Sequence, residues 1–140
     1  MRTDIIRNKL KEIEESIDLV RNHLPPDFDD FLELGLVKDG IYKRIEYSIE
    51  NVWDICSIIN SDLSQGIPYD ENNIPEKLIK AGILDREMGE NIKLMKGFRN
   101  IVVHRYGTID DKMAFQTLQI HLKDFHAFIR LIEDFLDNKI

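Results

Sequence analysis

The stretch IRNKLKEIEESIDLVRNHL, residues 6–24, determines the fold class. A set of its apolar residues recurs at steps of 4, 3, 4, 3 and 4 positions, which places them in one stripe along an α-helix. The stripe consists of Ile6, Leu10, Ile13, Ile17, Val20 and Leu24. Thr3 or Asp4 is predicted to cap this helix. Pro25-Pro26 is predicted to end it, because proline lacks a backbone donor and clashes with the preceding turn.

The same spacing predicts three more long helices. The second has a stripe from Ile41 to Ile59 and ends near residues 60–62; it begins before Ile41, at a point that Gly35 and Gly40 leave open. Asp85 is expected to cap the third helix, whose apolar stripe runs over residues 88–102 and which is predicted to end at Gly107. The fourth is predicted to begin at Asp110 or Asp111 and to carry its stripe to Phe135 or Leu136.

A short helix is predicted over residues 75–81, with Pro75 in its first turn and Gly82 as its stop, after a loop at residues 61–75. No convincing period-2 alternation predicts a strand. The chain has 140 residues, the size of one domain. We therefore expect a single all-α domain over residues 1–140, an antiparallel four-helix bundle with one short additional helix.

The composition excludes several classes of protein. Nineteen basic against 26 acidic residues give a net charge of −7, which excludes binding to nucleic acid through a large positive field. The single cysteine, Cys56, excludes an internal disulfide and a cysteine-built zinc site, and it lies on an apolar stripe typical of a core residue. The first residues lack an apolar run of signal-peptide length, and no 18-residue apolar run occurs, so a cytoplasmic protein without a membrane span is expected.

Metal-site patterns are also missing from the sequence. It contains no Glu-x-x-His pair of the kind that bundle di-metal sites use. His121 and His126 are five residues apart, about 140° around a helix, which does not favour one shared ion. Asp27, Asp29 and Asp30 lack the glycine and glutamate of a calcium loop and indicate a solvated acidic turn. We expect no metal ligands.

Residues 91–109 stand apart because they are basic in an acidic chain. They carry Lys93, Lys96, Arg99 and Arg105 and no acidic residue, so they hold +4 and the rest of the chain holds −7 − 4 = −11. Such an island favours a specific anionic ligand over a general affinity for polyanions.

The chemistry at the end of this island fits phosphodiester cleavage. Asn100 and His104 lie about 40° apart on one helix face, whereas Arg99 and His104 lie about 140° apart, so a long side chain or a loosening near Gly107 must bring them together. A base that accepts the proton of a 2′-hydroxyl and a cation that stabilises the charged phosphorane are what this reaction needs. A two-fold dimer would bring two histidines and two arginines to one phosphate.

Two structural interpretations stay open beside this one. An arginine, asparagine and histidine in one helix can form a capping or hydrogen-bonded cluster with no catalytic role. Glu50 and Asp54 form a carboxylate pair beside Trp53 on the second helix. Such a pair can do acid–base work, but a solvated face or a partner for basic side chains is the favoured interpretation.

The run Arg99-Asn100-Ile101-Val102-Val103-His104-Arg105-Tyr106 resembles the signature of the HEPN ribonucleases, an arginine and a polar residue followed by a histidine. Tyr106 completes the extended form that is typical of HepT-like toxins. The opening helix, the segment 45–58, the short helix before Gly82 and the final aromatic helix are also similar to HepT, so the resemblance covers nearly the whole chain.

The resemblance implies an HEPN-like bundle that forms a homodimer, with the two motifs facing each other across a cleft. It implies a metal-independent RNA endonuclease without cofactors, which leaves a 2′,3′-cyclic phosphate and a 5′-hydroxyl. It also implies a toxin of a type II or type VII toxin–antitoxin pair, silenced by an MntA-type nucleotidyltransferase antitoxin that transfers AMP to the motif tyrosine.

Carried onto this sequence, the resemblance makes His104 the acid–base residue and Arg99 the phosphate clamp. Asn100 would support them by orienting His104 or the phosphate, and Tyr106 would accept AMP. From their charge, Lys96 and Arg105 are expected to bind RNA. The alternative function is a non-catalytic helical module that binds a nucleotide or a nucleotidyltransferase.

Overall fold

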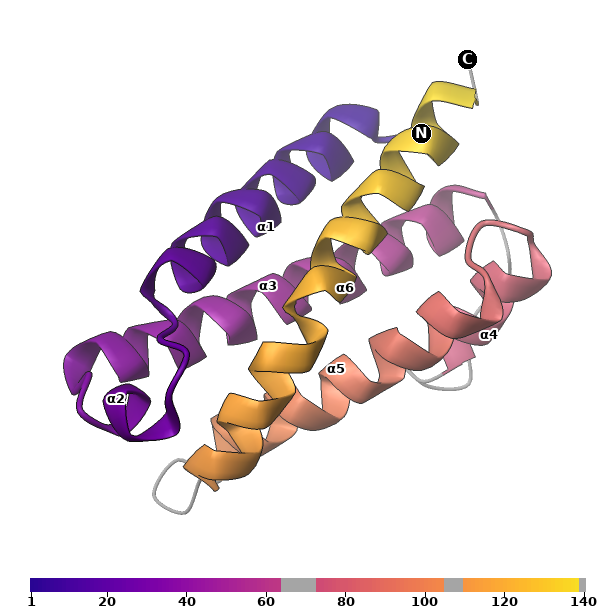
Figure 1. Ribbon diagram of the computed structural model, residues 1–140. Helices are drawn as coiled ribbons and strands as arrows, with labels where there is room; N and C mark the ends of the chain where they lie inside the picture. Colours follow the sequence, from indigo (N-terminus) through magenta and orange to yellow (C-terminus); the bar gives the residue numbers. More distant parts are fainter. Residues whose placement is uncertain (64–72, 105–109, 139–140) are drawn as a thin grey trace.

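Four long helices form an antiparallel bundle, in which each long helix runs opposite to the one before it (Figure 1). The computed structural model describes residues 1–63, 73–104 and 110–138, and for residues 100–104 it describes the backbone. The long helices are α1 (Thr3–His23), α3 (Leu36–Asp62), α5 (Arg86–His104) and α6 (Asp111–Asn138), and the short ones are α2 (Phe28–Leu32) and α4 (Asn73–Lys80). The predicted all-α bundle is confirmed, with α2 as a second short helix.

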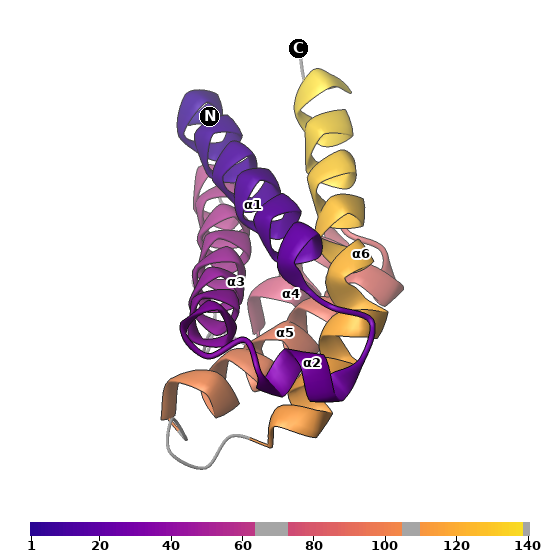
Figure 2. The ribbon, with the colours of Figure 1, turned by 60° about the vertical axis from the view of Figure 1, so that its left-hand side comes forward.

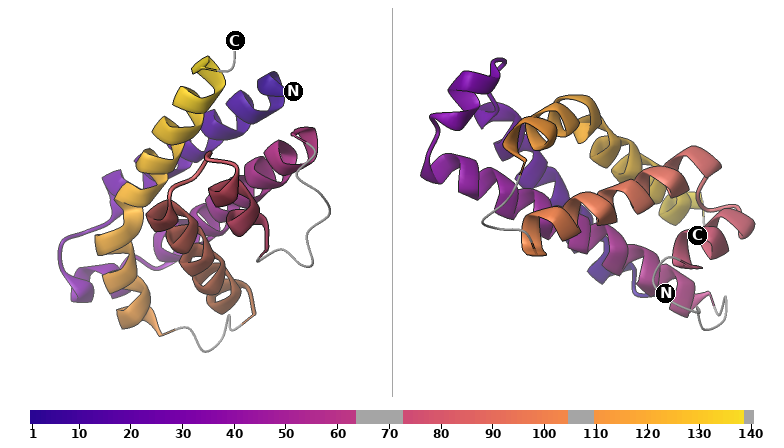
Figure 3. Two further views of the ribbon diagram at one scale, coloured as in Figure 1. Left: turned by 90° about the vertical axis from the view of Figure 1, so that its right-hand side faces the viewer. Right: turned by 90° about the horizontal axis from the view of Figure 1, so that it is seen from below.

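The helices enclose one core. α1 packs against α3 and α6, α5 packs against α3, and α4 lies on α3 and α5 (Figures 2 and 3). The first residues of α1 and the last residues of α6 lie at one end of the bundle, and the last turn of α5 and the first turn of α6 lie at the other (Figure 1). Cys56 is fully buried, as predicted, and burial raises the pKa of its thiol to about 12. None of the helices in the described ranges has the length and apolar character that crossing a membrane requires.

The predicted stripe of α1 faces the core, but the predicted cap is wrong. Ile6, Ile13 and Ile17 are completely buried, and the helix ends at His23, just before Leu24 and the two prolines. Its N-cap is Arg2, without a side-chain cap bond. The Asp62 carboxylate accepts a 2.9 Å hydrogen bond from the Arg2 backbone N–H, so the last turn of α3 holds the residue before α1 and the helix already includes Thr3.

The helix α2 was not predicted, because it forms around one buried aromatic residue rather than around a repeating stripe. Asp27 is the N-cap residue of this helix, without a side-chain cap bond, and Asp29 and Asp30 lie in its first turn. All three are exposed, so the acidic stretch is solvated as predicted, but it forms the start of a helix rather than a turn. Phe31 is completely buried, and its ring centre lies 5.1 Å from that of Phe115 on α6. Gly35, with φ of +60°, separates α2 from α3, which continues without a break through Gly40.

The N-terminal caps of α5 and α6 are the aspartates that were predicted to start these helices. The Asp85 carboxylate accepts a hydrogen bond from the backbone N–H of Met88 at 2.7 Å, and Asp110 accepts one from Met113 at 3.1 Å. α3 ends at Asp62 as predicted, and α4 begins at Asn73, two residues before Pro75. Gly82, with φ of +78°, follows α4. Most of the predicted loop 61–75 and the predicted end at Gly107 lie outside the described residues.

The start of α6 is fastened to the start of α3 by Asp111. Its carboxylate accepts hydrogen bonds from the Tyr42 hydroxyl at 2.5 Å and from the Lys38 ammonium at 2.9 Å. Burial and the Asp111 carboxylate raise the pKa of Tyr42, so the hydroxyl stays protonated and donates. Burial alone would raise the pKa of Asp111, but the hydrogen bonds from Tyr42 and Lys38 outweigh it, and the pKa is lowered.

We expect Asp111→Asn to destabilise the protein by about 1–2 kcal/mol at pH 7, because the amide cannot hold the Lys38 ammonium by charge. The Asp111 pKa is depressed in the folded state. The difference in unfolding free energy between wild type and variant should therefore be fully present above the pKa of an unfolded aspartate, about 3.9. It should vanish as the pH falls through the lower pKa that Asp111 has in the folded protein. Urea unfolding at several pH values measures it.

Asp137→Asn is the matched control. Asp137 pairs with Arg7 at 3.1 Å on the exposed surface of the other end of α6. A surface pair of this kind contributes between 0 and about 1 kcal/mol. Equal losses in the two variants would contradict the fastening role of Asp111.

Candidate functional site

The described part of the predicted catalytic segment, from Arg99 to His104, occupies the last turns of α5. Met88, Ile92 and Met95 are buried on this helix, and Phe98 packs partly buried against the core. This inner face fixes the rotation of α5. Three cations lie off this inner face and are spaced three residues apart: Lys93, Lys96 and Arg99. Each of them contacts a group on a neighbouring helix.

Lys93 is bound to α4. Its ammonium lies 2.9 Å from a Glu76 carboxylate oxygen, which also accepts a hydrogen bond from Arg86 at 2.8 Å. The hydrogen bonds from Lys93 and then Arg86 lower the pKa of Glu76. One of the four positive charges of the basic segment is therefore balanced within the fold.

Lys96 lies over an aromatic ring of α3. Its Nζ is 5.2 Å from the centre of the Trp53 ring, within the range of a cation–π interaction. The Trp53 side chain is 7% exposed, so its ring belongs to the interface between α3 and α5. The charge that was predicted to bind RNA is thus held beside this interface, close to Arg99 in the sequence.

Arg99, the predicted phosphate clamp, forms an ion pair with α3. Its Nε lies 3.5 Å from Oε1 of Glu50, and the two side chains are 29% and 43% exposed. This Nε is buried and makes no hydrogen bond within the described residues. Glu50 therefore acts on the inner side of the guanidinium through charge, while the group as a whole still reaches solvent.

These two contacts follow one register of α3 against α5, which was not predicted from the sequence. Glu50 and Trp53 are three residues apart on α3, and Lys96 and Arg99 are three apart on the antiparallel α5, so the two pairs match in reverse order. This matched spacing is the signal that could have revealed the contact. The other carboxylate of the predicted pair, Asp54, lies 3.4 Å from Lys9 on α1. Glu50 and Asp54 are therefore both partners of basic side chains, which is the interpretation that the sequence favoured.

The remaining motif residues are only partly within the described structure. Asn100 and His104 lie in α5, of which His104 is the last residue, and Arg105 and Tyr106 lie outside the described residues. The backbone is helical from Arg99 to His104, so the two positions are about 140° apart around the axis and about 7.5 Å apart along it. The described backbone is thus helical up to His104, and the position of the expected loosening, Gly107, lies outside the described residues.

The described residues hold no group of three or more histidine, cysteine, aspartate or glutamate side chains that could bind one metal ion. His121 and His126, the histidine pair of α6, each face a carboxylate. His121 Nδ1 lies 2.8 Å from Asp124, and His126 Nε2 lies 3.7 Å from Asp18.

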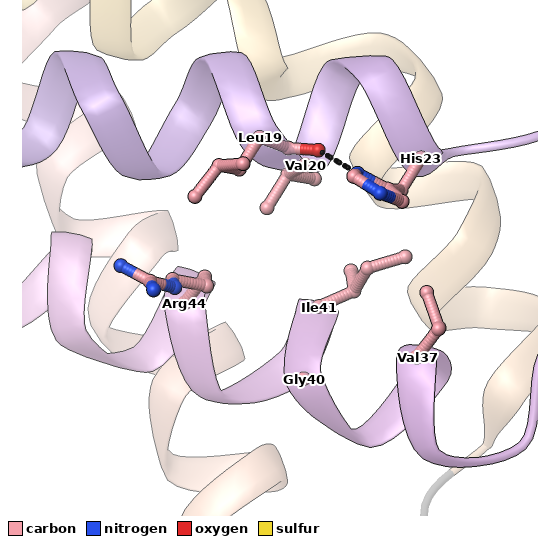
Figure 4. Close-up of a pocket in the computed structure, with 7 residues that line it drawn as sticks. All are labelled: Leu19, Val20, His23, Val37, Gly40, Ile41 and Arg44. Atoms are coloured by element: carbon pink, nitrogen blue, oxygen red, sulfur yellow. Dashed lines mark hydrogen bonds between the residues drawn. The ribbon is translucent and has the colours of Figure 1, made fainter.

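A groove of about 200 Å³ lies between α1 and α3, away from the motif segment in sequence (Figure 4). Leu19, Val20, Val37 and Ile41 give it an apolar lining, and Arg44 and His23 lie toward its two ends. The His23 ring nitrogen Nδ1 is 2.8 Å from the Leu19 carbonyl oxygen, a contact that belongs to the last turn of α1. Among the described side chains of the basic segment, residues 91–99, none lines this groove.

Comparisons with known proteins agree with the fold and with the resemblance to HepT-like proteins. The mRNA nuclease HepT of Shewanella oneidensis is 28% identical over 130 residues, covering 93% of this chain and 97% of that protein. The tRNA nuclease HepT of Aphanizomenon flos-aquae is 27% identical over 135 residues, covering 94% and 90%.

The fold matches a solved structure of the tri-AMPylated HEPN toxin of Shewanella oneidensis in complex with an MNT antitoxin. The TM-score is 0.84 at 28% identity, with 94% of this chain and 98% of that one covered. A family model described as "Ribonuclease HepT-like" matches residues 13–132, from the middle of α1 to the last turns of α6. With the motif at the end of α5 and the family pattern extending over nearly the whole bundle, the chain belongs to the HepT-like family of HEPN proteins.

Proposed function

We propose that this chain is a metal-independent endoribonuclease toxin, inhibited by a nucleotidyltransferase antitoxin. The observation that supports this most is the position of Arg99 and His104 at the end of α5, in a family whose relatives include an mRNA nuclease and a tRNA nuclease. Arg99 is partly exposed and belongs to a basic segment, which suits a phosphate ligand.

The proposed reaction needs a base, an acid and a cation at one phosphate. His104 of one protomer accepts the proton of the 2′-hydroxyl as its oxygen bonds to phosphorus. The bond from phosphorus to the 5′-oxygen breaks, and an imidazolium protonates that oxygen. The products are a 2′,3′-cyclic phosphate and a 5′-hydroxyl. Arg99 stabilises the charge that develops on the phosphorane, and Asn100 orients the histidine or the phosphate.

A homodimer supplies what one chain lacks. One histidine is not base and acid in the same step, and one α5 sets the backbone positions of Arg99 and His104 about 140° apart. Two copies with their α5 ends at a two-fold axis would place two arginines and two histidines in one cleft. Lys96 and Arg105 would then contact flanking phosphates.

The proposed antitoxin is an MntA-type nucleotidyltransferase that transfers AMP to Tyr106. The related toxin of known structure is tri-AMPylated and bound to an MNT antitoxin. An adenylyl group on Tyr106 adds bulk and negative charge to the cleft, which would repel an RNA backbone. The expected place of action is the cytoplasm, where both RNA and such a transferase occur.

One experiment with two arms tests the function. Protein purified without the transferase, and shown by mass spectrometry to be unmodified, should cut RNA in the presence of EDTA. Protein co-expressed with the transferase should carry adenylyl groups on Tyr106 and cut at least tenfold more slowly. If the unmodified chain cuts no RNA from a diverse pool, and its expression alone does not arrest growth, the non-catalytic binding module is the better description.

A further inference from the structure

We infer that Glu50 is a positioning residue for Arg99: it sets the direction of the guanidinium from α3 so that its outer amino groups meet the RNA phosphate. This inference rests on the proposed function and adds a residue of a different helix to its site. The first support is the contact itself, 3.5 Å between Arg99 Nε and Glu50 Oε1.

The place of contact on the guanidinium matters. An arginine carries its five N–H donors in a planar fork, with one edge at Nε and the other at the two terminal amino groups. Glu50 approaches at Nε, which is buried, and the Arg99 side chain is 29% exposed. The carboxylate therefore takes the inner edge and leaves the outer edge for a bidentate phosphate contact.

The register of α3 against α5 limits how Arg99 can turn. One turn earlier on α5, Lys96 lies over Trp53, so the interface beside Arg99 is filled by an aromatic ring and a second cation. Turning the Arg99 guanidinium toward that position would bring it closer to the Lys96 ammonium, which like charges disfavour. The acid on one side and the cation on the other hold the arginine near one direction.

The charge of Glu50 also has a cost for binding. A carboxylate beside the clamp repels a phosphate in the ground state as well as in the transition state. The advantage of the carboxylate is that it orients the Arg99 guanidinium, and this orientation matters most in the transition state, when charge develops on the phosphorane. Removing the charge should therefore lower kcat and leave KM unchanged or lower.

The test compares Glu50→Gln with the matched variant Asp54→Asn. Both remove one carboxylate charge from the outer surface of α3, one turn apart, but Asp54 pairs with Lys9 on α1 and not with the motif. We expect Glu50→Gln to lower kcat about tenfold, equal to about 1.4 kcal/mol. Asp54→Asn should stay within about twofold of the wild type in kcat and KM. Glu50→Asp should recover part of the loss.

A second measurement does not depend on cleavage. The Arg99 Nε–H resonance, assigned by its loss in Arg99→Lys, reports how restrained the guanidinium is. It should become more mobile in Glu50→Gln and stay unchanged in Asp54→Asn. An unchanged resonance in Glu50→Gln overturns the inference whether or not the chain cuts RNA, and so do equal kinetic losses in the two variants. If the wild type cuts nothing while the resonance responds as expected, the proposed function fails and the positioning of Arg99 by Glu50 stands.

Discussion

His104→Ala should lower the rate of RNA cleavage by about 10³–10⁴-fold, the upper range for loss of general acid–base catalysis. The loss is at the upper end because, in the proposed homodimer, one substitution removes both histidines and with them the base and the acid. A uniformly labelled RNA pool, cut by unmodified protein in EDTA, gives the rate. Size-exclusion chromatography with light scattering should show the same assembly for variant and wild type.

The control for this substitution is His23→Ala. His23 is exposed at the last turn of α1, where its ring contacts the Leu19 carbonyl of the same helix. Its rate should stay within about twofold of the wild type, as expected for a surface change. Persistent cleavage by His104→Ala after a second purification step would remove His104 from the reaction.

Phe128→Ala should cost about 3–5 kcal/mol in the free energy of unfolding, because it deletes a large side chain from a packed core. Phe128 on α6 is completely buried and is among the largest fully buried side chains of the described residues. A domain of this kind has about 5–15 kcal/mol of stability in total, so the variant should be partly unfolded at 37 °C. Urea unfolding followed by circular dichroism measures the change, with the slope m as the check on two-state behaviour.

Leu36→Ala provides the contrast for the core. Leu36 is also a large apolar side chain, but it is 87% exposed at the first residue of α3. Its loss should change stability by no more than about 0.5 kcal/mol. A Phe128→Ala loss as small as this would mean that the α6 core position is packed far more loosely than the structure shows.

The sequence allowed the long helices to be predicted because each buries a repeating stripe, and a stripe is visible without knowledge of the partner. Ile6 to Val20 is the clearest example, and the Asp85 and Asp110 caps were visible for the same local reason. The Arg2 N-cap was not, because it depends on Asp62, sixty residues away. The helix α2 was missed because five residues around Phe31 are too short to show a period.

In the candidate site, too, the local patterns could be predicted from the sequence and the contacts between helices could not. The spacing of Arg99 and His104 is a local pattern, so the sequence alone made them candidate site residues, and the resemblance supplied their expected roles. The contacts of Arg99 with Glu50 and of Lys96 with Trp53 depend on the position of α3 along α5, and their matched three-residue spacing is informative only once these two helices are known to be neighbours. The same is true of Lys93, whose charge the composition counted as available and which Glu76 binds.

The shared end of the bundle at which α1 starts and α6 finishes has a practical value for immobilisation. α6 has 28 residues and is therefore about 42 Å long, and it leads from the motif end of the bundle to this opposite end. A biotin, a fluorophore or a bead linker attached before α1 or after α6 would hold each molecule by the end remote from α5's last turn. Two tethered copies could then still approach each other, and an RNA strand, through the ends that carry His104.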